Sequence, residues 1–334
     1  MFFKDIDEVK VYADINASFE FDVLAPKLKQ VDRDILNLHF GNDFIEEIQT
    51  AYDGTTLGNI STLTLAEQQI IKKFRAITAP LAVALYITPG QVQIDNSGIF
   101  IARNENRATA FEWQIKDLTK SYLRPGYQAI EDAIIFLQKN ISSYTTYQNS
   151  EEFNYSKLCF VPTAKEFTKY YSPLNNSYMS FLKMRSCMDK VDEMDIANVL
   201  LPDYYTELKT KIAADTLTVA DKAIIPYIKK AIVNLTALKA LSELNATFDE
   251  NGFMIFDNTS NASTGSPKKT ALGEPIVRAQ ESLKTSGEAY LLALKNFLID
   301  NKVSYPTFIN DPKYVADQSA TFNNKPGQGY FAAL

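Results

Sequence analysis

The strongest constraint on this chain is that one stretch of it occurs twice. Residues 63–98 match residues 217–252 without a gap, at an offset of 154 residues. Each copy predicts an apolar helix followed by a short β-hairpin. Each helix begins with a threonine N-cap and has an acidic residue three positions later. The identical pairs are Leu63 and Leu217, Thr64 and Thr218, Ala66 and Ala220, Ile70 and Ile224, and Ile71 and Ile225.

Matches continue on both sides of this stretch. The offset is 160 residues upstream and 161 residues downstream. Each change of offset marks an insertion in one copy. We place the two insertions in the polar segments 53–62 and 258–269, where insertions disturb packing least. We infer a tandem duplication of one module. The outlying matches include Val31 and Val191, Asp32 and Asp192, Asp43 and Asp203, Gly126 and Gly287, and Tyr144 and Tyr305.

The repeat defines the expected architecture. We predict a mainly α fold, made by tandem duplication of a helical module in which each copy carries a small β-hairpin. The first repeat is expected over 1–150, with its hairpin near 91–101, and the second over 151–303, with its hairpin near 246–256. An extended C-terminal arm is expected over 304–334, because proline, glycine and scattered aromatic residues replace the helical pattern there.

Composition excludes several classes of protein. The 334 residues include 34 Lys and Arg against 40 Asp and Glu, and this net charge of −6 argues against a protein that coats duplex DNA. Cys159 and Cys187 are too few for a disulfide framework and indicate a reducing compartment. The apolar runs are too short to span a bilayer, so we expect no membrane contact.

A search for chemistry finds no catalytic set. The only histidine, His39, falls at the end of a predicted helix, and no metal site of histidine or thiolate type is possible with so few ligands. Nucleotide-binding and hydrolase motifs are absent from the sequence. We therefore expect no enzyme, no catalytic residue, no cofactor and no metal.

Two groups of residues leave alternatives open. Asp189, Asp192 and Glu193 share one helix face, which is either a solvated surface or the carboxylate cluster of a metal-dependent enzyme acting on nucleic acid. Trp113, with Phe111 and Tyr122, is expected in a core or an interface rather than in a platform on which bases stack.

The predicted arm is rich in aromatic residues. Six of them occur in about thirty residues, without helical or strand periodicity. Aromatic anchors carry much of the binding energy at protein interfaces, so we predict that the arm docks on a partner. The candidate partner-binding residues are Tyr305, Phe308, Tyr314, Phe322, Tyr330 and Phe331.

Two sequence patterns carry a family resemblance. One runs from 24–28 through Val31 and Asp32 to Phe40 and Gly41, and the other from 65–67 through Ile70 and Ile71 to 82–86, followed by the hairpin at 92–98. Together they resemble an uncharacterised family of phages and prophages of Bacteroidetes. Each copy is also distantly similar to the helical head–tail connector proteins of tailed phages, which are also called adaptor or head-completion proteins.

The resemblance implies a structural role in the virion. Connectors form a ring beneath the portal, extend the DNA channel and receive the tail. A ring of 6 or 12 copies would then contact the portal and the tail or further neck proteins, and DNA would pass through its lumen without sequence-specific binding. The protein would be made in the bacterial cytoplasm and end at the head–tail junction of the virion. The alternative to this role is a helical interaction scaffold outside the virion.

Overall fold

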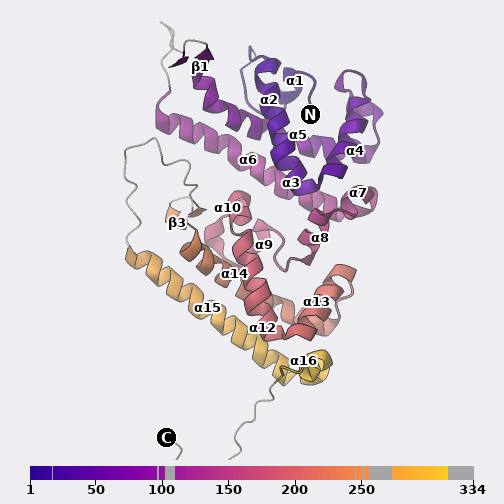
Figure 1. Cartoon of the computed structure of the whole chain (residues 1–334), viewed down its shortest axis with the longest axis vertical. Helices are drawn as coiled ribbons and strands as arrows, with labels where there is room; N and C mark the ends of the chain where they lie inside the picture. Colours follow the sequence, from indigo (N-terminus) through magenta and orange to yellow (C-terminus); the bar gives the residue numbers. More distant parts are fainter. Residues whose placement is uncertain are drawn as a thin grey trace, which may run out of the picture.

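The computed structural model describes residues 1–16, 18–95, 98–101, 110–244, 246–249, 252–255 and 273–314. Two helical modules lie one above the other, and short helices connect them (Figure 1). The tandem duplication and the mainly helical fold expected from the repeat are confirmed.

The first module is built around two long helices. Its central helix packs against both α2 and the 28-residue α6. A two-stranded antiparallel hairpin lies between these long helices in sequence, with Asp95 opposite Gly98. The elements are α1 (Ile6–Lys10), α2 (Phe21–Val31), a π-helical segment (Asp32–Leu36), α3 (Asn37–Phe40), α4 (Asn42–Asp53), α5 (Leu65–Ile87), β1 (Val92–Asp95), β2 (Gly98–Ile101) and α6 (Glu112–Lys139).

The second module repeats this order after two connecting helices. Its central helix packs against a long helix that is also 28 residues long, and its hairpin pairs Asp249 with Gly252. The connecting helices are α7 (Thr145–Gln148) and α8 (Glu151–Leu158). The module consists of α9 (Ala164–Tyr170), α10 (Tyr178–Lys183), α11 (Arg185–Lys190), a π-helical segment (Val191–Ile196), α12 (Ala197–Leu200), α13 (Pro202–Ala214), α14 (Val219–Glu243), β3 (Ala246–Asp249), β4 (Gly252–Ile255), α15 (Gly273–Asp300) and α16 (Pro306–Asn310).

Both central helices begin with the predicted capping box. The Glu67 backbone N–H donates to the Thr64 hydroxyl at 3.3 Å, and the Glu67 carboxylate accepts from the Thr64 backbone N–H at 2.8 Å. Thr218 and Asp221 make the same pair of bonds at 3.1 and 2.9 Å. These bonds satisfy donors that a helix start otherwise leaves unpaired.

A glycine lets each central helix approach its long partner closely. A Cβ atom built on Gly126 of α6 would lie 2.5 Å from Cδ2 of Leu81, and one built on Gly287 of α15 would lie 2.5 Å from Cδ2 of Leu235. Atoms at that distance overlap, so a side chain at either position would displace the leucine side chain opposite. The buried apolar side chains of both modules form one continuous cluster, so the modules pack as one body.

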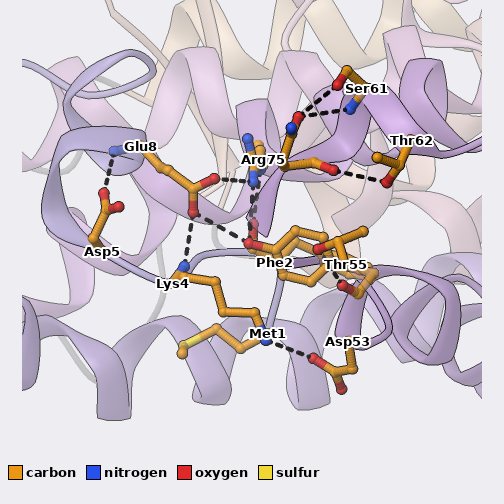
Figure 2. A network of polar contacts seen from close by, with 12 residues as sticks. Met1, Phe2, Lys4, Asp5, Glu8, Asp53, Thr55, Ser61, Thr62 and Arg75 are labelled. Atoms are coloured by element: carbon orange, nitrogen blue, oxygen red, sulfur yellow. Dashed lines mark hydrogen bonds and ion pairs between the residues drawn. The ribbon is translucent and has the colours of Figure 1, made fainter. Parts of the chain in front are cut away.

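A buried arginine ties the leading segment to the central helix (Figure 2). Arg75 of α5 is 7% exposed, and its Nε donates to the Phe2 carbonyl at 2.8 Å. Its Nη2 donates to Glu8 at 2.5 Å and to the Tyr52 hydroxyl at 3.1 Å.

The second module keeps the ion pair of this network. Lys229 lies at the position that matches Arg75, and it pairs with Glu166 of α9, the helix that corresponds to α1. The leading helix of each copy is therefore joined to its central helix by one carboxylate and one cation.

None of the helices in the described part of the chain is both long enough and apolar enough to cross a bilayer.

The ion pair predicts a graded loss of stability. Arg75→Met leaves the Glu8 carboxylate without its guanidinium, and we expect a loss of about 3 kcal/mol in the free energy of unfolding. Arg75→Lys keeps a cation, as the second copy does, and should lose less than half as much. Chemical denaturation followed by circular dichroism measures both variants, and equal losses would contradict the assigned role of the charge.

Candidate functional site

The contact between the modules is centred on a buried carboxylate. Glu131 of α6 is 1% exposed, and it accepts from Gln128 Nε2 at 2.9 Å and from the backbone N–H of Lys165 at 3.1 Å. That N–H belongs to the first turn of α9, where Thr163 already caps the helix by accepting from Glu166. A negative charge is favourable at a helix N-terminus. Glu131 therefore joins the first module to the start of the second.

A cavity of about 240 Å³ is lined by residues of both modules and of the connecting helices. The guanidinium carbon of Arg185 is 4.3 Å from the ring centre of Tyr155, and Arg185 Nε is buried without a hydrogen bond. The lining also includes two carboxylates, Glu151 and Glu152, so its charged side chains have a formal net charge of −1. Its lining comprises Leu38, His39, Ile134, Tyr147, Glu151, Glu152, Tyr155, Ser156 and Arg185.

The single histidine lies in the same place. His39 is in α3, as predicted for a helix end, and its ring centre is 6.3 Å from that of Tyr178 in the second module. Burial, together with the positive charge of Arg185, lowers the pKa of His39 to about 4. The imidazole is therefore neutral near pH 7 and packs as an aromatic ring at the junction.

The depressed pKa predicts acid sensitivity. The unfolded chain, with a histidine pKa near 6.5, takes up the proton before the folded chain does. The contribution of His39 is therefore complete above about pH 6.5 and is lost as the pH falls toward 4. Between pH 7 and pH 5, the wild type should lose about 2 kcal/mol more stability than His39→Gln. Denaturant titrations at the two pH values measure this difference, and parallel losses would contradict it.

The predicted carboxylate cluster is divided among different partners. Asp189 accepts from the Tyr155 hydroxyl at 2.6 Å, and Asp192 accepts from Lys209 Nζ at 2.5 Å. Burial raises the pKa of Asp192, and Lys209 opposes that shift. Glu193 is exposed.

These side chains do not converge on one point. Among the residues that the structure describes, no three His, Cys, Asp or Glu side chains come together as a metal site.

The two cysteines are placed as apolar side chains. Cys187 is buried, and the half-buried Cys159 thiol donates to the Tyr155 carbonyl at 3.3 Å. Burial raises the pKa of both thiols, which favours the unreactive protonated form.

The start of the predicted arm belongs to the second module. Tyr305 and Phe308 are each 2% exposed, so these two candidate partner-binding residues are core residues in this structure. The boundary predicted at 303 is therefore too early, because α16 packs on α13 after it. Tyr314 is half-buried against Phe308, with ring centres 5.4 Å apart. Phe322, Tyr330 and Phe331 lie outside the described residues.

Tyr305 repeats a contact of the first module. The Tyr144 hydroxyl donates to the Ala66 carbonyl at 2.9 Å, and the Tyr305 hydroxyl donates to the Ala220 carbonyl at 2.8 Å. Both carbonyls lie in the first turn of a central helix. The match between Tyr144 and Tyr305, which the repeat already showed, therefore marks a structural residue.

This equivalence predicts equal effects in the two copies. Tyr144→Phe and Tyr305→Phe should each lower the free energy of unfolding by about 1 kcal/mol, since each loses one hydrogen bond. Tyr314→Phe is the control, because its hydroxyl makes no hydrogen bond to the described residues. Chemical denaturation of the three variants tests this, and an unchanged Tyr305→Phe would contradict a core role.

Comparison with known proteins identifies two copies of one family. The profile of a family of unknown function (DUF6712) matches residues 34–157 and again residues 196–318. The second match extends through α16 and includes Tyr305 and Phe308, in agreement with their burial. No curated protein and no solved structure matches the chain.

Proposed function

We propose, from the premise that this chain belongs to the DUF6712 family of unknown function through two tandem copies, that it is a virion structural protein. It forms a ring at the head–tail junction of a tailed phage, where it joins the portal to the tail and extends the DNA channel. The protein acts in this role as a connector, and it carries out no reaction.

The tandem duplication is the observation that carries this proposal. Two similar modules share a continuous core and meet through Glu131, so each chain supplies two equivalent units in a fixed relation. Repetition of such a unit around an axis gives a closed ring when the rotation between neighbours adds up to a full turn without a shift along the axis. Six chains then place twelve similar modules around the channel, and twelve chains place twice that number.

The packing of the helices supports the resemblance to connectors. The resemblance implies that the helix containing residues 24–40 packs on the helix containing residues 70–86. In this chain α2 and the π-helical turn that follows it continue into α3, and α2 packs along α5. The net charge of −6 suits a channel through which DNA slides, because like charges keep the backbone from adhering.

We retain the proposed partner-binding role for the part of the arm that follows the second module. Phe322, Tyr330 and Phe331 provide aromatic anchors for a neighbouring subunit or for the portal. Tyr305 and Phe308 are excluded from this role because their side chains fill the core of their own module.

The mass of the assembled protein tests the proposal. Mass photometry of the purified full-length chain should find a species of six or twelve times the chain mass of 37.6 kDa. The fraction of chains in this species should increase with protein concentration. Addition of the portal protein encoded near the same gene should move the ring into a larger complex. A monomer at every concentration, alone and with the portal, would contradict the proposed function.

A further inference from the structure

The first half of α6 carries a stripe of three basic residues and one large aromatic ring, with the exposed acidic Asp117 on the same face. Trp113, Lys116, Lys120 and Arg124 follow one another at spacings of three and four residues, which places them on one face of the helix. Trp113 is 63% exposed, and Lys116, Lys120 and Arg124 are also exposed. We call these four residues the α6 stripe. Lys116 pairs with Glu112 of its own helix, whereas Lys120 and Arg124 have no ion pair with the described residues.

The second copy shows that the module does not need this stripe in order to fold. α15 has the same length and the same glycine contact, yet its matching residues are of different chemistry. Residues required by packing, such as Gly126 and Tyr144, recur in the second copy as glycine and tyrosine. The counterparts of the α6 stripe are Glu274, Val277, Glu281 and Thr285.

A complementary face lies on the opposite side of the first module. Asp43, Glu46 and Glu47 of α4 are exposed, have no ion pair with the described residues, and rim a shallow hollow. Thr50 and Thr146 complete its lining. Figure 1 shows α4 on one side of this module and the first half of α6 on the other.

The acidic face is also weaker in the second copy. Thr206 of α13 replaces Glu46, and Glu207, which replaces Glu47, is paired with Lys211 at 2.5 Å. Both members of the complementary pair are therefore features of the first copy.

We propose that the α6 stripe of one chain docks on the acidic α4 face of a second copy of this chain. The two surfaces differ and lie on opposite sides, so the contact is head-to-tail and can close into a ring. Opposite charges steer the encounter and set the register, while burial of the Trp113 ring supplies affinity. This inference rests on the ring assembly proposed above and assigns its interface to the first module.

Trp113 allows the contact to be followed directly, because it is the only tryptophan in the chain. As concentration rises, the emission of the full-length protein should shift to shorter wavelength at the concentrations where mass photometry detects assembly. Lys120→Glu should raise the concentration needed for assembly about tenfold or more, because it places like charges together. The fold tolerates this change, since the second copy already carries Glu281 at the matching position.

A charge swap distinguishes the loss of this specific contact from a general effect of the change in net charge. Lys120→Glu combined with Glu46→Lys in the same chain should restore assembly, because each contact then pairs the reversed charges. Lys29→Glu is the matched control: it makes the same change of charge at an exposed position on α2 and should assemble as the wild type does.

The possible outcomes distinguish failure of the proposed interface from failure of the proposed ring assembly. If the wild type assembles and Lys120→Glu assembles equally well, this interface is wrong and the ring remains. If the wild type stays monomeric at every concentration, the proposed ring is itself wrong. If the Trp113 emission responds to a single-stranded oligodeoxynucleotide and not to assembly, the stripe binds nucleic acid and the docking proposal is overturned.

Discussion

The close approach of each central helix to its long partner is the contact on which the rest of the structure depends. Gly126 and Gly287 allow it, because any side chain there would overlap the leucine opposite. A helix packed this closely is buried on most of its surface, so its polar groups need partners within the module. At the exposed helix starts, the capping boxes at Thr64 and Thr218 pair the first backbone N–H groups. The hydroxyls of Tyr144 and Tyr305 add a hydrogen bond in the first turn of each helix.

Comparison of the two copies separates the needs of folding from the needs of function. Glycine, tyrosine and the capping threonine are unchanged, and the ion pair of the leading helix survives as Lys229 with Glu166 although the cation differs. Exposed residues have no packing reason to be kept. The first copy alone carries the basic stripe of α6 and the more acidic face of α4, so a surface role explains these features better than stability does.

Much of the fold could be predicted from the sequence because the repeat constrains it twice. The central helices, their caps and the glycine that ends the match at each hairpin follow from local patterns that recur in order. The junction could not be predicted, because Glu131 and Arg185 act on segments far away in the chain and no local pattern indicates those partners. The only signal was a carboxylate among apolar neighbours, Ile130 and Ile134. The predicted partner-binding role of Tyr305 is wrong, because Tyr305 was grouped with the aromatic residues that follow it and not with its match, Tyr144.

We propose that this duplicated module assembles into a ring. The most direct measurement is the symmetry of negatively stained particles of the purified full-length chain. The account predicts closed rings with a central channel and an outline in which two lobes repeat for each chain. Isolated two-lobed particles at all concentrations, or open filaments that never close, would contradict it.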